Sequence, residues 1–520
     1  MTKQVAVFVL VVAIAALFRF YDIKNIPPGL YPDEAMNGNN AIQALEDGPP
    51  EGGFKIFYPE NNGREGLFIN IQALSLKIFG YHPWALRIVS AMFGILTVVG
   101  VFLMGRQLFN WQVGAISSFL LAVSFWHTLF SRIGFRAIMA PFFLVWAAYF
   151  LLKGLRKASY WYFSAAGFFY GLGFYSYLAY RITPFIIIFT LAAYWASTKR
   201  GFSHSKYGYA KARLARLTAL FIIATIITTL PIAYYFWTHQ GDFFGRAEQI
   251  SVLASSSPLK QLIINAGQTL GMFNFVGDFN WRHNLAGEPM LFWPVGIMFT
   301  VGLLRCIVNI LFAYRKHGHA NTIDAFLVSW FFIGLVPVIL SNEGLPHALR
   351  SIIIVPPVFL IAGEAIWWVY EKVKHWSGYD HNQAIGVYHF HLRESSFFGA
   401  IFIIAILGST AIMEFDKYFF RWALNPEVSI AYDHSSTELS YALNQLGTKV
   451  KKYVVVNQPG VLVNGIPMPA QTIMFITNTS TIDRQKAKNL YYLTEQDFTD
   501  GRYDKKASIF LLKNGNQQTN

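Results

Sequence analysis

Charged residues are scarce in this chain of 520 residues: they make up 13% of it, whereas an average soluble domain carries about 25%. Hydrophobic residues make up 54%, and aromatic residues 17%. A soluble globule needs a more highly charged surface, and a disordered chain needs fewer apolar side chains. The composition therefore excludes both classes and favours a protein that is embedded in a membrane.

Cysteine is almost absent, because the chain has Cys306 and no other. This excludes an intramolecular disulfide, a cysteine-based zinc site and a CxxC redox centre. The net charge of +14 would suggest nucleic acid as a partner of a soluble protein. Here, however, the basic residues gather in short segments between apolar runs, a pattern that reflects membrane topology and not nucleic-acid binding.

About eleven apolar runs are long enough to cross the roughly 30 Å hydrocarbon core of a bilayer. They lie near 4–20, 86–105, 113–131, 137–153, 160–179, 182–197, 217–237, 291–312, 324–341, 349–370 and 396–413. The sequence therefore predicts an all-α polytopic membrane protein over residues 1–415.

Lysine and arginine predict the orientation of these helices. The basic loops are 105–111, 153–159, 197–216, 315–323 and 371–395, and they all fall inside if the N-terminus is cytoplasmic. An odd helix count then places the C-terminus outside. The first run could be a signal peptide, but it lacks a clear cleavage site, so we expect an uncleaved anchor. Without organelle signals, a prokaryotic plasma membrane is the expected location.

Residues 416–520 have the composition of a soluble domain, which we expect to be α/β and extracytoplasmic. A helical pattern at 435–446 precedes strand-like stretches at 453–457, 472–477 and 508–513, with a lysine-containing helix among them. The glycine-rich phosphate-binding patterns GxGxxG and GxxxxGK[ST] do not occur there. Within the membrane part, 67–74 has the spacing of an amphipathic helix that lies along the interface.

An Asp33–Glu34 pair follows the first apolar run, after Pro32. Two adjacent carboxylates are unusual in a chain with so few acidic residues, so they call for a structural or functional explanation. They could begin a helix, with Asp33 as its N-cap and Glu34 in its first turn. They could also have a catalytic or ligand role, and a carboxylate held rigidly by a helix could serve both purposes.

The order of these features resembles the GT-C superfamily of lipid-carrier-dependent glycosyltransferases. In that superfamily a single N-terminal helix is followed by an outside Asp-Glu pair that opens a helix, then by a long amphipathic loop and many transmembrane helices. Within it, the chain is similar to the protein O-mannosyltransferase and aminoarabinose-transferase branch. Three further stretches carry the resemblance: Asn62-Gly63-Arg64-Glu65-Gly66, where Glu65-Gly66 replaces the family's Pro-Pro; Gly277 to Asn284, which contains Arg282 and His283; and Pro346 to Arg350, which contains His347.

The resemblance implies an enzyme that moves a sugar from a polyprenyl phosphate to an acceptor hydroxyl or phosphate on the outer side. Asp33 would take the acceptor proton, Glu34 would position Asp33 or the acceptor, and a single displacement would invert the anomeric centre. The substrate-binding residues would be Arg64, Glu65, Arg282, His283, His347 and Arg350. A divalent metal ion is a candidate cofactor, and Glu65 with His283 is one imaginable site. Protein, lipid or polymer acceptors and membrane lipids remain open as partners, and nucleic acid is excluded.

Several of these residues also have a simpler structural interpretation, and other classes of membrane protein remain as alternatives. Arg64 could pair with Glu60 or Glu65, Arg350 could reach lipid headgroups, and His283 could be a hydrogen-bonded loop residue. A transporter or flippase of lipid-linked sugars would need ionisable groups in several helices, and the apolar runs offer mainly Glu364. A non-catalytic glycan- or lipid-binding membrane protein is a further alternative. An oligosaccharyltransferase is disfavoured because the tail lacks a Trp-Trp-Asp motif.

Overall fold

The fold was analysed in a computed structural model of residues 1–520. The described residues are 2–48, 52–60, 62–198, 211–243, 252, 257–317, 322–342, 344–376 and 388–512. Most of the predicted basic loop at 197–216 and parts of those at 315–323 and 371–395 lie outside these residues.

Within the described residues, nine helices are long and apolar enough to cross a membrane. They are α1 (Lys3–Phe20), α4 (Pro83–Leu108), α7 (Met139–Lys157), α9 (Thr183–Thr198), α10 (Lys211–Thr238), α13 (Trp293–His317), α14 (Thr322–Ile339), α15 (Val355–Trp376) and α16 (Tyr388–Asp416). This confirms the expected mostly helical, multi-span membrane protein.

The other two predicted spans are shorter helices. The run at 113–131 is divided between α5 (Trp111–Val123) and α6 (Phe125–Phe130), because the chain leaves helical geometry at Ser124. The run at 160–179 forms α8 (Tyr160–Gly173), which packs against α7 and α10. Helices α5 and α6 are buried among other helices, whereas α8 has an exposed side that includes Trp161. A continuous apolar run therefore did not distinguish a short helix from a full membrane span.

Two ionisable groups in apolar runs have protein partners. Glu364 on α15 forms an ion pair with Arg305 on α13. His127 on α6 is buried, and its Nδ1 lies 2.7 Å from Nη2 of Arg19 on α1. These contacts link neighbouring helices, as expected for polar groups that are costly to leave unpaired inside a membrane.

The chain after α16 continues through a π-helical turn (Lys417–Trp422) and α17 (Pro426–Ala431) into a small α/β region. Its parallel sheet has the order β6-β3-β7, with β3 at Lys452–Val456, β6 at Leu490–Thr494 and β7 at Ser508–Leu511. The helices are α18 (His434–Gln445), α19 (Gln471–Thr477), α20 (Ile482–Lys488) and α21 (Glu495–Thr499). A hairpin of β4 (Leu462–Val463) and β5 (Ile466–Pro467) precedes α19.

The prediction of a strand at 472–477 was wrong, because this stretch forms α19. Its β-branched residues favour a strand locally, but Ile473 belongs to the core of the α/β region while Phe475 packs among residues of the membrane part. A helix can present side chains to both cores, so tertiary packing overrides the local preference. Strand β6 was not predicted.

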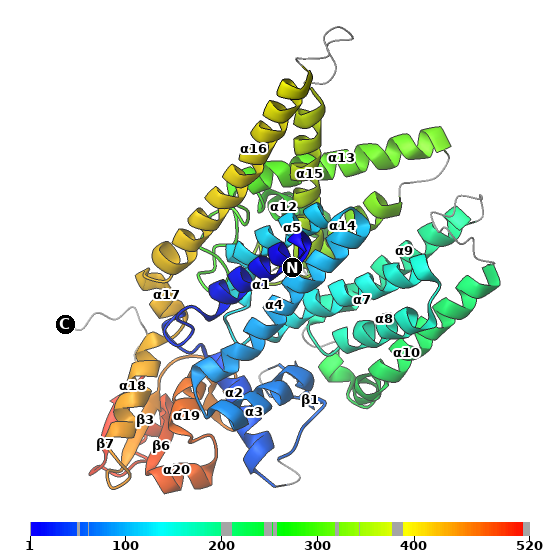
Figure 1. The fold of residues 1–520 in the computed structure, drawn as a ribbon. Helices are drawn as coiled ribbons and strands as arrows, with labels where there is room; N and C mark the ends of the chain where they lie inside the picture. Colours follow the sequence, from blue (N-terminus) through cyan, green and yellow to red (C-terminus); the bar gives the residue numbers. More distant parts are fainter. Residues whose placement is uncertain are drawn as a thin grey trace.

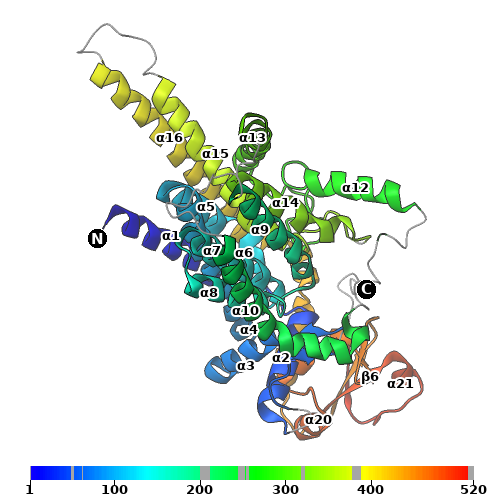
Figure 2. The ribbon, with the colours of Figure 1, turned by 90° about the vertical axis from the view of Figure 1, so that its right-hand side faces the viewer.

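Helix α2 (Pro32–Glu46) joins the α/β region to the membrane part. It packs against α19 and against α3 (Gly66–Phe79). The presence of α3 confirms the helix that was predicted at 67–74. A Cβ atom on Gly38 would lie 2.4 Å from the ring of Phe475, so the close approach of α2 and α19 requires glycine there. Figures 1 and 2 both place α2, α3 and the α/β region at the same end of the helical bundle.

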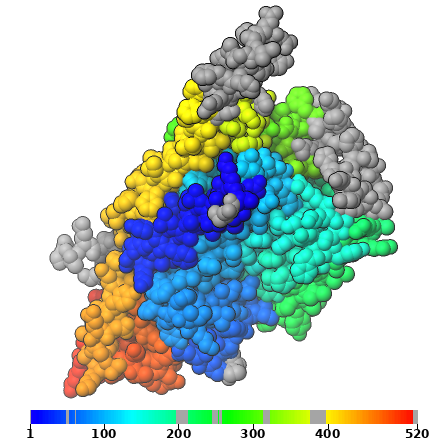
Figure 3. Space-filling view, viewed as in Figure 1, coloured from blue at the N-terminus to red at the C-terminus, as the bar shows by residue number. Residues whose placement is uncertain are grey.

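The loop before α2 is also tied to this region. The Leu30 amide donates to Thr437 Oγ1 (3.0 Å), and Thr472 Oγ1 donates to the Leu30 carbonyl (2.8 Å). Figure 3 shows the orange C-terminal surface lying directly against the blue N-terminal surface. The tail is therefore fixed beside the Asp33–Glu34 pair.

We expect Phe475→Ala to loosen this attachment. Phe475 is fully buried, and truncation of a buried phenylalanine costs about 3–5 kcal/mol. Thermal unfolding of the purified protein should begin at a lower temperature than in the wild type. Phe54→Ala is the matched control, because Phe54 is 55% exposed; equal effects of the two substitutions would contradict the packing described here.

Candidate active site at the start of helix α2

The two carboxylates at the start of α2 have different surroundings. Pro32 is the first helical residue, and Tyr31, not Asp33, occupies the N-cap position. Asp33 and Glu34 follow in the first turn, where the exposed N–H groups of a helix favour negative charge. The Asp33 side chain is 37% exposed, whereas Glu34 is fully buried. Only Asp33 is therefore accessible to a substrate.

Glu34 forms a buried ion pair with Arg87 of α4, whose Nε lies 3.1 Å from Glu34 Oε2. The Gly134 amide donates to the same oxygen at 2.7 Å. Arg87 also donates to the carbonyls of Pro27 and Gly29, in the loop before α2. These bonds fix the beginning of α2 against α4 and the 27–29 loop, and so set the position of Asp33.

Asp33 accepts a hydrogen bond from Arg64, at 3.0 Å between Nη2 and Oδ1. Arg64 is 4% exposed and belongs to β2 (Arg64–Glu65), where it pairs in register with Tyr58 of β1 (Phe57–Tyr58). The short hairpin thus holds a buried cation beside the exposed carboxylate. The structure pairs Arg64 with Asp33 and not with the Glu60 or Glu65 partners considered from sequence.

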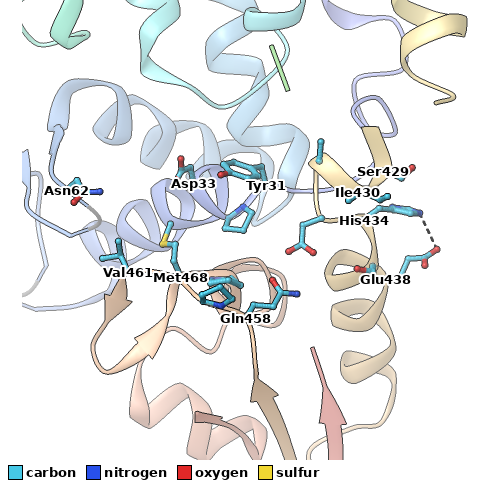
Figure 4. A pocket seen from close by; sticks show the side chains of 17 residues that line it. Tyr31, Asp33, Asn62, Ser429, Ile430, His434, Glu438, Gln458, Val461 and Met468 are labelled. Atoms are coloured by element: carbon cyan, nitrogen blue, oxygen red, sulfur yellow. Dashed lines mark ion pairs between the residues drawn. The ribbon is translucent and has the colours of Figure 1, made fainter. Parts of the chain in front are cut away.

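Asp33 is one of the residues that line a cavity of about 680 Å³ between the membrane part and the tail (Figure 4). Tyr31, Asp33 and Asn62 line it from the N-terminal part of the chain, and segments 429–438 and 458–469 line it from the tail. His434 forms an ion pair with Glu438 at this wall, at 3.3 Å. Because burial raises the pKa of Asp433, this carboxyl group is a weaker acid than usual.

Arg282 approaches the same place from the loop between α12 (Pro258–Gly271) and α13. Its guanidinium carbon lies 4.2 Å above the ring centre of Tyr31, two residues before Asp33. The phenol of Tyr432 donates to the Arg282 carbonyl at 3.0 Å and connects this loop to the tail. Burial, followed by the negative charge of Asp33, raises the pKa of Tyr31, so its hydroxyl stays neutral. Two cations, Arg64 and Arg282, therefore flank the cavity wall at Asp33.

Asp278, His283 and His347 form a compact cluster that could hold a metal ion. Their ligand atoms lie within 4.8 Å of one another. Asp278 Oδ2 is 3.2 Å from His283 Nδ1 and 3.9 Å from His347 Nδ1, and it also accepts the Ala348 amide. One carboxylate and two imidazoles serve as the protein ligands of some catalytic zinc sites. Burial lowers the pKa of His283 while Asp278 opposes the shift, so the imidazole favours the neutral form that binds metal.

The remaining predicted residues have protein partners. Glu65 Oε2 accepts from Arg136 Nε at 2.6 Å, and Arg181 lies 3.9 Å from its other oxygen. Arg350 donates to Ser341 Oγ. The structure therefore brings His283 together with Asp278 and His347, instead of the imagined pair with Glu65.

Asp278 was missed by the sequence interpretation, although it lies only five residues before His283. The available signal was that Asp278 is one of two acidic residues, with Glu288, in the loop 272–292. The partner His347 is about seventy residues away in sequence, and only the fold brings it close.

The fold and the sequence both have relatives among membrane glycosyltransferases. Residues 67–235 match the family model described as dolichyl-phosphate-mannose-protein mannosyltransferase. The putative mannosyltransferase YkcB of Bacillus subtilis is 28% identical over 164 residues, which cover 31% of this chain and 21% of that protein. The chain thus matches about a fifth of its curated relative's length.

Solved structures of two enzymes have the same fold at low identity. An apo oligosaccharyltransferase of Archaeoglobus fulgidus has a TM-score of 0.57 at 15% identity, over 94% of this chain and 64% of that one. The same enzyme was also solved with Zn and sulfate, with a TM-score of 0.53 at 16% identity, over 93% of this chain and 62% of that one. ArnT of Cupriavidus metallidurans bound to undecaprenyl phosphate has a TM-score of 0.52 at 14% identity, over 95% and 90% of the two chains.

These findings confirm the predicted resemblance. The chain shares its fold with the archaeal oligosaccharyltransferase and with ArnT, and residues 67–235 match the dolichyl-phosphate-mannose-protein mannosyltransferase family model.

We expect the purified protein to bind one Zn²⁺ at the cluster of Asp278, His283 and His347. Asp278→Asn and His347→Ala should each weaken this binding at least tenfold, because each removes one of three protein ligands. Titration calorimetry with Zn²⁺ measures the affinity. His239→Ala, which changes an exposed histidine outside the cluster, is the control; equal Zn²⁺ affinity in all four proteins would contradict the site.

Proposed function

We propose that this protein is an enzyme that transfers a sugar from a polyprenyl-phosphate donor to an acceptor hydroxyl group. The observation that carries the proposal is the position of Asp33, which lines a cavity while a buried arginine holds its carboxylate. The membrane fold and the mannosyltransferase family match support the class of reaction. ArnT was solved with undecaprenyl phosphate, which supports a donor of this kind.

Asp33 is the proposed base. It would accept the proton of the acceptor hydroxyl as the oxygen attacks the anomeric carbon, and the bond from that carbon to the donor phosphate would break. The leaving phosphate is already a stable anion, so no general acid is needed. A single displacement of this kind inverts the anomeric configuration. Glu34 would act through its pair with Arg87, as a positioning residue.

Arg64 and Arg282 are the proposed partners of the donor phosphate, since guanidinium groups suit phosphate oxygens. Both lie at the wall that bears Asp33. His283, His347 and Arg350 would support this side of the site, and Glu65 would hold Arg136 and Arg181 in place. A divalent ion held by Asp278, His283 and His347 would add positive charge near the phosphate.

An apolar groove of about 540 Å³ could take the first part of the donor's lipid tail. It is lined by Phe174, Thr229, Ile232, Ala233, Phe236, Trp237, Gln240 and Phe243, together with Arg181. Arg181 also lies beside Glu65, the neighbour of Arg64 in β2. The groove and the proposed phosphate site are therefore joined through a short chain of contacts.

The charge of the cavity favours a neutral or cationic acceptor. Asp33, Asp433 and Glu438 line it, and His434 is the one basic side chain among the lining residues that the structure describes. An acceptor rich in phosphate groups would meet like charges there. We therefore propose a hydroxyl of a protein or an uncharged glycan as the acceptor, in preference to a phosphate.

We also propose that the reaction takes place on the outer face of the plasma membrane, which follows from the lysine and arginine content of the loops. Residues 416–520 would then be an extracytoplasmic domain. The segments of this domain that line the cavity make it a part of the acceptor site.

Asp33→Asn should reduce sugar transfer by at least a hundredfold, because the amide cannot accept the proton. The assay incubates purified protein with radiolabelled polyprenyl-phosphate sugars and membrane extract, and measures label in the acceptor fraction. Asp500→Asn, an exposed change in the tail, should transfer normally. Full transfer by Asp33→Asn would remove Asp33 as the base, and no transfer by the wild type would favour a non-catalytic or transport protein.

Arg282→Ala should raise the KM for the donor about tenfold, the equivalent of about 1.4 kcal/mol, since it removes a charged contact to the phosphate. Arg64→Ala should affect both kcat and KM, because Arg64 also holds Asp33. Donor saturation curves at a fixed acceptor concentration measure these constants. Arg502→Ala is the control, since this side chain is exposed on the tail; unchanged donor curves in both active-site variants would contradict the phosphate site.

A further inference from the structure

A second cavity lies on the other side of the β4–β5 hairpin from the first. It has a volume of about 500 Å³, a size typical of sites for small molecules. Val461 and Met468 line the first cavity, while Val463 and Ile466 of the hairpin line the second. Met36, Val463 and Met468 pack together as a small apolar cluster between the two.

One face of α2 forms a wall of this second cavity. Met36, Asn39, Asn40 and Gln43 all line it, and their spacing of three, four and seven residues places them on the same side of a helix. This face is buried beneath the tail, yet three of its four side chains are amides. Buried helix faces are usually apolar, so the amide side chains on this face call for an explanation.

The buried amides are only partly satisfied. Asn39 and Asn40 are 4% and 2% exposed. Asn39 Nδ2 donates to Gln471 Oε1 at 2.8 Å, but Asn39 Oδ1 and Asn40 Nδ2 have no hydrogen-bond partner among the residues that the structure describes. Leaving such groups unpaired costs about 1–3 kcal/mol each. The residues of this wall thus include polar atoms that the described residues leave unpaired.

The cavity also combines this polarity with apolar surface and little net charge. Gln471 and Gln485 add further amides, and Met474 and Ile466 add apolar contacts. Lys55, Glu60 and Asp483 are the charged lining residues, with a formal sum of −1. An amide donates and accepts at once, which suits a hydroxyl group that does the same.

We propose that this cavity binds an uncharged saccharide. Rings that carry several hydroxyl groups would pair with the amides, and their C–H faces would lie against the methionine side chains. This goes beyond the proposed transfer reaction, because binding here needs neither the donor nor Asp33. A saccharide that filled the cavity would contact α2 one helical turn after the proposed base.

Gln43→Leu tests the proposal, because it keeps the size of the side chain and removes its polar atoms. Gln43 is half-buried, so the change should leave the fold intact, and Asn40→Leu serves as a second variant at the buried wall. Gln496→Leu makes the same change at an exposed position on α21 and is the matched control. Asp33→Asn tests whether the ligand occupies the catalytic cavity instead.

The probes are uncharged trisaccharides of mannose, glucose and N-acetylglucosamine, and uncharged tripeptides for comparison. Saturation-transfer NMR in a detergent without a sugar headgroup measures binding. We expect at least one trisaccharide to bind the wild type, Gln496→Leu and Asp33→Asn alike, and to bind Gln43→Leu and Asn40→Leu at least tenfold more weakly.

The proposal is overturned if no trisaccharide binds, if binding survives Gln43→Leu, if Asp33→Asn loses binding, or if tripeptides bind in place of the sugars. Its failure is distinguishable from failure of the proposed transferase, since saccharide binding is measured without donor. A wild type that binds the trisaccharide but transfers no label would fail only the transfer assay.

Discussion

The candidate site depends on the buried ion pair between Glu34 and Arg87. A carboxylate and a guanidinium that are both removed from solvent are stable only when their remaining hydrogen-bonding groups are also satisfied. Here Gly134 donates to Glu34, and the 27–29 loop accepts from Arg87. This network fixes the first turn of α2 through Glu34. The side chain of the adjacent Asp33 is therefore not needed to anchor the helix and lines the cavity.

Helix α2 then gives the two cavities different chemistry. Its first turn presents a carboxylate beside Arg64 and near Arg282, which suits proton transfer next to a phosphate. About two turns later, its buried amides line a second cavity with a formal charge of −1. The tail completes both walls through the β4–β5 hairpin, so it contributes to the chemistry as well as covering the membrane part.

Some of the site could be predicted from sequence, because local patterns reveal local structure. Pro32 followed by two acids indicates a helix start, and the structure has one there. The contrast between Asp33 and Glu34 could not be predicted, since it depends on Arg87, which is 53 residues away from Glu34. Likewise, His283 was predicted as a site residue from the sequence. Asp278 became recognisable as a candidate metal ligand only because the fold brings it close to both His283 and His347. At 472–477, β-branched residues favoured a strand, whereas contacts with two cores stabilise a helix.

Sequence alone is enough to place the chain in a membrane, to locate its apolar helices, and to identify the segment that has the composition of a soluble tail. These properties follow from hydropathy and helical spacing, which act over a few turns of chain. The folded arrangement is needed to know which carboxylate lines a cavity, which histidines lie beside the same aspartate, and that the tail packs over α2. Those outcomes depend on contacts between residues distant in sequence, and on the need of each buried polar group for a nearby partner.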